Sequence, residues 1–123
     1  MSNVPLISIV DDDDSLRVWL DNLIRSAGFR AHGFSSPEAF LSSNGARETS
    51  CLVLDVRLAP MSGLELQRQI VQAEWRIPII FITAYRDDEA RARAIKAGAV
   101  AFLYKALHEQ ELLDAIDVAL GRA

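Results

Sequence analysis

Five short apolar runs divide this chain, and they constrain its fold more than any other feature. The runs lie at residues 6–10, 29–34, 51–54, 77–82 and 100–104. Short apolar runs bounded by polar segments are typical of strands that are buried on both faces of a parallel sheet. The run at 29–34 is of mixed polarity and includes Arg30 and His32, so we expect that strand at the edge of the sheet.

The segments between these runs carry the spacing and the capping residues of helices. We predict helices at residues 16–27, from 37 onward, at 64–73, at 86–96 and at 109–120. Asp13 or Asp14 can cap the first helix, and Gly28 and Gly98 stand where glycine commonly ends a helix. Strands that alternate with helices form a parallel sheet covered on both faces, so we predict one α/β domain over residues 1–123.

Each predicted helix offers residues to the core. On the first helix these residues are Leu16, Trp19, Leu20, Leu23, Ile24 and Ala27. The short second helix offers Ala39, Phe40 and Leu41, and Trp75 is expected to pack in the loop after the third helix. The fourth helix is rich in alanine, with Ile95 as its only bulky anchor. Weak burial there predicts a loosely held, movable helix.

The composition excludes several classes of function. Half of the 123 residues are hydrophobic, and the net charge is −4 without a lysine and arginine cluster, so direct nucleic-acid binding by this segment is not expected. No apolar run has the length of a membrane span, and Met1, Ser2 and Asn3 lead into a strand rather than a signal peptide. Cys51, the single cysteine, lies in a buried run, which favours a reducing compartment such as the cytoplasm.

Polar side chains stand at the ends of four predicted strands. Asp11 and Asp12 follow the first run, Asp55 the third, Thr83 the fourth and Lys105 the fifth. Because the carboxyl ends of parallel strands share one edge of the sheet, we expect these groups to lie together. Each alone has a simpler interpretation as a local cap or turn residue. Crowded carboxylates are relieved by a cation, and Mg2+ prefers a few carboxylates together with waters and a phosphate.

Short strings at these strand ends jointly resemble the receiver domain of two-component response regulators. The strings are Val10-Asp11-Asp12, Leu54-Asp55, Met61-Ser62-Gly63, Thr83-Ala84 and Lys105, in order and in register. The resemblance covers essentially the whole chain and implies a flavodoxin-like, doubly wound fold with strand order 2-1-3-4-5. Residues 61–66 resemble more narrowly the receivers that precede a helix-turn-helix transcription-factor domain. No such output domain is present here, so we expect a stand-alone receiver or a piece of a longer protein.

The resemblance implies a phosphorylation-controlled switch. Asp55 is then the phosphoacceptor, Lys105 pairs with the phosphate, and Thr83 hydrogen-bonds a phosphoryl oxygen once it is present. Phe102 takes the position of the family's switch aromatic, whose rotation remodels the face formed by the fourth helix, the fifth strand and the fifth helix. A simpler interpretation is that Phe102 is a core aromatic only.

The resemblance also implies a metal site and two residues that tune hydrolysis. Mg2+ is expected on Asp12, Asp55 and the backbone carbonyl of Arg57, with Asp11 acting through water. The side chains of Arg57 and Tyr85 follow the phosphoacceptor and the threonine by two residues each. Both could overhang the phosphoryl group and control how an attacking water enters.

The implied partners are a sensor histidine kinase and a DNA-binding output domain, either its own or separate, and a phosphorylation-dependent homodimer is a further expectation. The chain is not expected to be an enzyme, beyond assisting its own phosphorylation and dephosphorylation. An unphosphorylated binding module with the same fold is a second hypothesis. A Mg2+-dependent phosphohydrolase is a third, disfavoured because Arg57 stands where a general acid is needed.

Two positions depart from the family pattern. Ala106 follows Lys105 where the family usually has proline, and Pro60 comes one residue later than is common. A peptide bond that precedes a residue other than proline costs about 2.5–4 kcal/mol in the cis form. We therefore predict a trans bond between Lys105 and Ala106. The alternative is that the fold enforces the cis form because the lysine must be placed over the site.

Overall fold

The computed structural model describes residues 4–122 and contains a five-stranded parallel sheet with strand order β2-β1-β3-β4-β5. The strands are β1 (Leu6–Val10), β2 (Arg30–Phe34), β3 (Thr49–Asp55), β4 (Ile79–Thr83) and β5 (Ala101–Tyr104). The predicted fold class, strand order and edge position of β2 are confirmed. The prediction on Met1, Ser2 and Asn3 concerns residues outside the described range.

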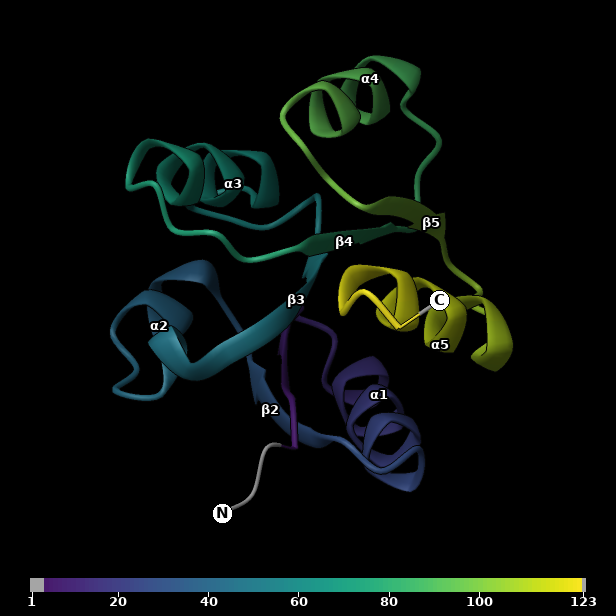
Figure 1. The fold of residues 1–123 in the computed structure, drawn as a ribbon. Coiled ribbons are helices and arrows are strands. Elements are labelled where there is room, and N and C mark those ends of the chain that lie inside the picture. The colour runs from purple at the N-terminus through teal and green to yellow at the C-terminus, as the bar shows by residue number, and fades with distance from the viewer. Residues whose placement is uncertain (1–3, 123) are drawn as a thin grey trace.

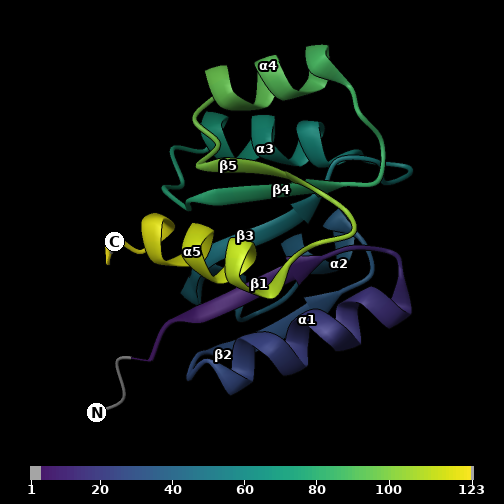
Figure 2. The same ribbon diagram turned by 90° about the vertical axis from the view of Figure 1, so that its right-hand side faces the viewer.

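Five α-helices cover the two faces of this sheet (Figure 1). They are α1 (Asp14–Ser26), α2 (Pro37–Leu41), α3 (Gly63–Gln72), α4 (Asp88–Lys96) and α5 (Glu109–Ala119), and a short 3-10 helix, η1 (Ala46–Glu48), precedes β3. Helices α1 and α5 lie on one face, and α2, α3 and α4 lie on the other (Figures 1 and 2). None of the helices in residues 4–122 is long and apolar enough to cross a membrane.

Side-chain caps fix where four of the helices begin. Asp13, Ser36, Ser62 and Asp87 each accept a hydrogen bond from the backbone N–H three residues later, at 3.0–3.1 Å. Such caps satisfy backbone donors that the first turn of a helix leaves free. Part of the acidic run after β1 therefore has a structural use, with Asp13 as the cap of α1.

Each face of the sheet has its own core. On one face, Leu20 and Ile24 of α1 and Leu112 and Ile116 of α5 pack against β1, β3 and β4. On the other face, the core contains side chains from all three covering helices, namely Phe40, Leu66, Ile70, Ala90 and Ala94. Trp75 packs against this second core and stacks on Phe40 with ring centroids 5.7 Å apart, as expected for a packing residue.

The predicted helix faces were wrong at five positions. Trp19, Ala27, Ala39, Leu41 and Ile95 are exposed, with Ile95 at 41%. Successive helical residues point about 100° apart, so the neighbours that reach the sheet turn these side chains toward solvent. This error matters most for α4. Its buried residues are alanines, and its one bulky apolar side chain, Ile95, does not anchor it to the sheet.

Candidate functional site

The predicted site residues lie at the edge of the sheet where β1, β3, β4 and β5 end. Strand register places Val10 beside Leu54, and Thr83 beside Tyr104, so the residues that follow are neighbours in space. A cavity of about 420 Å3 opens there. Its walls are Asp12, Asp13, Asp55, Arg57, Ala84, Tyr85 and Lys105.

Three carboxylates and one ammonium group form the polar centre of this cavity. One oxygen from each of Asp11, Asp12 and Asp55 lies within 4.8 Å of the others. Lys105 Nζ lies 2.9 Å from Asp11 Oδ2 and 3.2 Å from Asp55 Oδ2. Asp11 is fully buried and Asp55 nearly so, whereas Asp12 is exposed. The structure thus brings together the acids and the lysine that the strand ends predicted.

Short-range hydrogen bonds fix the orientation of the two buried carboxylates. Asp11 Oδ1 accepts from the backbone N–H of Asp13 at 2.8 Å, and Asp55 Oδ1 accepts from that of Arg57 at 3.1 Å. The Arg17 side chain donates to the carbonyl oxygen of Asp11 at 2.8 Å. In each carboxylate, one oxygen is therefore tied to the backbone and the other is turned toward Lys105.

Burial and charge shift the pKa values of two groups at this site. Burial raises the pKa of the Asp55 carboxyl, and the nearby Asp11 carboxylate raises it further, against the lowering influence of the Arg57 N–H and Lys105. Burial alone would lower the pKa of Lys105, but the Asp11 and Asp55 carboxylates together outweigh it and raise that pKa. The negative charge at this edge is therefore only partly neutralised by the lysine.

The donor set suits a hard divalent cation. Asp11 Oδ2 is buried and lacks a hydrogen bond of good geometry, although Lys105 Nζ is close to it. Carboxylate oxygens grouped within 4.8 Å beside an open cavity are the ligands that Mg2+ accepts, with waters completing its shell. The acidic cluster therefore fits the Mg2+ site that the strand ends predicted.

The peptide bond between Lys105 and Ala106 is cis, so the trans prediction was wrong. The prediction gave the local cost of the bond more weight than the placement of Lys105, which was the alternative reason for a cis bond. In the structure, the Lys105 N–H donates to the Thr83 carbonyl at 2.8 Å while its ammonium group pairs with Asp11 and Asp55. These contacts come from other strands and have no trace in the local sequence. The lysine reaches the site without a following proline.

Two of the predicted site residues, Thr83 and Phe102, have only local partners or core contacts in this structure. Thr83 Oγ1 accepts from the Tyr85 N–H at 3.2 Å and donates to the Tyr85 carbonyl at 3.3 Å, so it is bonded within its own loop. Phe102 is only 7% exposed and packs against Phe81 and Tyr104. In this structure, Thr83 therefore has the hydrogen bonds of a local cap, and Phe102 has the surroundings of a core aromatic.

Arg57 and Tyr85 meet at the mouth of the cavity. The guanidinium carbon of Arg57 lies 4.7 Å from the centre of the Tyr85 ring. Arg57 Nη2 also lies 3.9 Å from Asp87 Oδ2. The Tyr85 side chain is 59% exposed. These contacts join the loop after β3 to the loop after β4 directly beside Asp55.

Sequence reasoning missed two supporting residues. A Cβ atom on Gly63 would overlap the Asp55 carbonyl oxygen, so only glycine allows α3 to begin so close to the end of β3. The sequence did offer a signal for Gly63, because glycine does not stabilise the first turn of a helix and so needs another reason to be there. The contact from Arg17 to Asp11 had no signal, because it depends on how α1 leaves the sheet.

The fold and the site together define an open, doubly wound α/β domain with an acidic centre at the carboxyl edge of its sheet, and comparisons with known proteins identify its family. A sequence model of the response regulator receiver domain matches residues 7–117. The chain belongs to this family of two-component signalling domains. It is 46% identical over 118 residues to the response regulator protein TmoT of Ectopseudomonas mendocina, covering 96% of this chain and 54% of TmoT.

Solved structures agree with this assignment. The response regulator StyR matches with a TM-score of 0.88 and 48% identity, covering 96% of this chain and 60% of StyR. FixJ-N matches with a TM-score of 0.86 and 34% identity, covering 100% of this chain and 98% of FixJ-N. The chain spans about half the length of the curated relatives it matches.

Proposed function

We propose that this domain is a phosphorylation-controlled switch that accepts a phosphoryl group on Asp55. The observation that carries the proposal is the Asp55 carboxylate, nearly buried at the end of β3 and held between Lys105 and two further acids. A carboxylate is a weak nucleophile, so positioning and charge neutralisation must supply most of the rate.

In the proposed transfer, an Asp55 oxygen forms a bond to phosphorus while the bond from phosphorus to the donor breaks. The donor is a histidine-kinase phosphohistidine or a small phosphodonor such as acetyl phosphate, and its leaving nitrogen or oxygen retains the bonding electron pair. Lys105, already 3.2 Å from Asp55, would then pair with a phosphoryl oxygen as a fixed positive charge.

We propose that Mg2+ binds to Asp12, Asp55 and the backbone carbonyl of Arg57, with Asp11 acting through water. These residues would hold the ion, whose charge would screen the carboxylates from the incoming phosphoryl oxygens. Asp12 is the exposed member of the acidic cluster and lines the cavity, so it is open to a cation from solvent. The raised pKa of Asp55 supports the need for more positive charge than Lys105 provides.

Thr83 would carry the signal away from the site. When its hydroxyl turns to a phosphoryl oxygen, it must give up its two hydrogen bonds to the backbone of Tyr85, which frees the loop that leads into α4. Phe102 lies on β5 in the core under α4 and would rotate as that loop moves. We assign Thr83 and Phe102 as the switch residues on this basis.

The pair formed by Arg57 and Tyr85 would control the lifetime of the phosphoryl group. Its side chains line the cavity beside Asp55. From there they would restrict the approach of a water molecule to a phosphoryl group on Asp55. The domain would in this way assist its own dephosphorylation without acting on a separate substrate.

We propose a sensor histidine kinase as the phosphodonor partner and a DNA-binding output domain as the regulated partner. The match to TmoT over about half of that protein's length supports a larger regulator of this kind. A phosphorylation-dependent homodimer through the face of α4, β5 and α5, and a cytoplasmic location, belong to the same proposal.

Acetyl phosphate labelling in Mg2+, followed by intact-protein mass spectrometry, tests the proposal. The wild type should gain one phosphoryl group, Asp55→Asn should gain none, and Asp12→Ala should lose Mg2+ binding and label far more slowly. Asp21→Asn, which changes a half-buried acid paired with Arg25 on α1, is the control and should label as the wild type does. Labelling of Asp55→Asn at the wild-type rate would place the acceptor elsewhere, and an unlabelled wild type would favour the constitutive binding module.

A further inference from the structure

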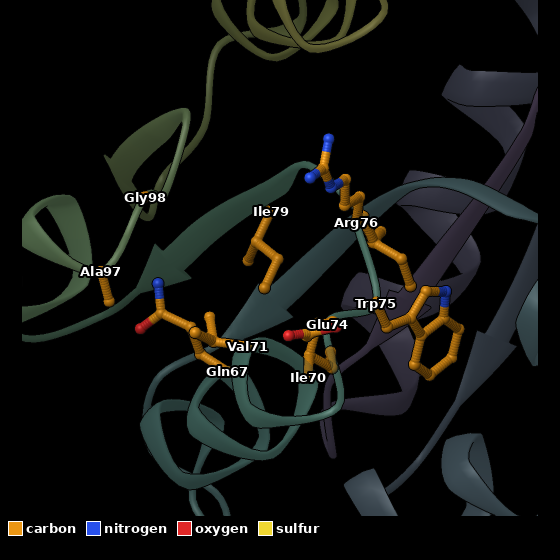
Figure 3. A pocket seen from close by; sticks show the side chains of 10 residues that line it. Gln67, Ile70, Val71, Glu74, Trp75, Arg76, Ile79, Ala97 and Gly98 are labelled. Carbon is orange, nitrogen blue, oxygen red and sulfur yellow. The ribbon is translucent and has the colours of Figure 1, made fainter.

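A groove runs between α3 and α4, away from the carboxyl edge of the sheet. It consists of two hollows of about 460 Å3 and 310 Å3, which share Gln67, Val71 and Ala97 and are therefore continuous. Figure 3 shows the first hollow, with Gln67, Val71 and Ile79 around it. We call this feature the α3/α4 groove.

The floor of the α3/α4 groove is apolar and preformed. Ile70, Ile77 and Ile79 line the first hollow as buried side chains, and Val71, which lines both hollows, is 52% exposed. The buried Gln67 side chain donates to the Ala94 carbonyl at 3.0 Å and so links α3 to α4 across the groove. A partner would therefore meet a shaped apolar surface rather than one that must first be ordered.

The rim of the groove is basic, although the whole chain carries a net charge of −4. Of the 13 lysine and arginine side chains, all within the described residues, five make no ion pair, hydrogen bond or stacking contact with an aromatic ring. These five are Arg68, Arg76, Arg91, Arg93 and Lys96. All except Arg91 line the α3/α4 groove.

The unpaired cations are thus concentrated around one groove with an apolar floor. Within residues 4–122, Glu74 is the only acid that lines either hollow, which leaves three net positive charges. An apolar floor with a basic rim is complementary to a ligand that has an apolar stripe flanked by carboxylates. The ten residues of α3 extend over about 15 Å, which matches roughly three turns of a docked helix.

We infer that the α3/α4 groove binds an acidic amphipathic helix of a partner protein. Apolar side chains at helical spacing would enter the two hollows beside Val71, and flanking carboxylates would pair with Arg68, Arg93 and Lys96. The groove shares α4 with the face of α4, β5 and α5, but none of its lining residues lines the cavity at Asp55. The inference therefore does not require phosphorylation of Asp55.

A fluorescently labelled synthetic helix tests the inference by anisotropy titration of the whole chain. The probe is a capped peptide of about four turns with leucines on one face and glutamates elsewhere, and a peptide with lysines in place of the glutamates is its control. The wild type should bind the acidic peptide and not the basic one. Val71→Asp and Arg93→Glu should each weaken binding by more than about tenfold.

Matched control variants distinguish binding of the peptide in this groove from nonspecific electrostatic attraction to the protein. Val118→Asp changes a valine of similar exposure, 56%, on α5, and Arg91→Glu makes the same charge change on α4 outside the groove. Both should bind the acidic peptide within about twofold of the wild type. If Arg91→Glu weakened binding as much as Arg93→Glu does, the inference would be overturned, because the attraction would then be nonspecific. Unchanged binding by Val71→Asp would also overturn it, because the ligand would then be a simple polyanion.

Discussion

Helices α1 and α4 are both packed on the same sheet, yet they are held very differently. Leu20 and Ile24 of α1 are fully buried, whereas α4 buries only the small side chains of Ala90 and Ala94. Buried apolar area stabilises a protein by about 25 cal/mol per Å2, so α1 gains far more from its position than α4 does. The comparison indicates a firm scaffold at α1 and a weakly held element at α4, next to the loop that bears Thr83.

The largest expected effect contrasts the two helices directly. Leu20→Ala should lower the free energy of unfolding by about 2–5 kcal/mol, because it leaves a cavity in a fully packed core. Ile95→Ala on α4 should change it by less than about 0.5 kcal/mol, since Ile95 is 41% exposed and is not part of the core. Urea denaturation measures both, and equal losses would contradict the difference in packing.

A second prediction concerns the junction between scaffold and site. Gly63→Ala should lower the free energy of unfolding by about 1–3 kcal/mol and slow labelling of Asp55, because its Cβ would push against the end of β3. Gly45→Ala is the matched control, since a Cβ there has only ordinary contacts and the residue has a negative φ. Equal urea midpoints for Gly63→Ala and Gly45→Ala would show that the close approach of Gly63 to the end of β3 does not affect stability.

A change at the proposed phosphoacceptor, Asp55, should raise the free energy of unfolding rather than lower it. The pKa of Asp55 is raised by burial and by Asp11, so its ionisation weakens the folded state as pH rises through that raised pKa. Asp55→Asn removes this loss and should increase the urea midpoint at pH 7, with the gap to wild type closing at acidic pH. Urea titrations at several pH values measure the gap. A gap that widens on acidification would show that the pKa is lowered instead.

The smallest expected effect is purely kinetic. Tyr85→Ala should change the half-life of phosphorylated Asp55 by less than about tenfold, which corresponds to about 1.4 kcal/mol in the barrier, and leave the unfolding free energy nearly unchanged. Tyr85 is 59% exposed and contacts Arg57, so its removal opens the cavity without disturbing the core. Phosphate release after removal of acetyl phosphate measures the half-life. Identical half-lives in the two proteins would exclude a gating role.

The parts of the structure that the sequence predicted are those governed by local chemistry. Apolar runs and helix caps located all five strands and helices, because burial and capping act within a few residues. The meeting of Asp11, Asp55 and Lys105 followed from the geometry of parallel strands.

The parts that escaped prediction depend on contacts between distant segments. The cis bond after Lys105 occurs where Thr83, Asp11 and Asp55 hold the lysine, and these come from three other strand ends. The exposure of Ile95 depends on which face α4 turns to the sheet, and alanine-rich spacing does not specify that face. The basic rim of the α3/α4 groove arises only when Arg68 and Arg93 are brought together from two helices.

Hydrogen exchange of the phosphorylated-state mimic is the most direct test of the central claim, that phosphorylation of Asp55 acts on the weakly held α4. Wild type and Asp55→Asn would be measured with and without beryllofluoride in Mg2+. We expect changed protection in α4 and β5, little change in α1, and no change anywhere in Asp55→Asn. Equal changes in α1 and α4, or a full response in Asp55→Asn, would contradict the account.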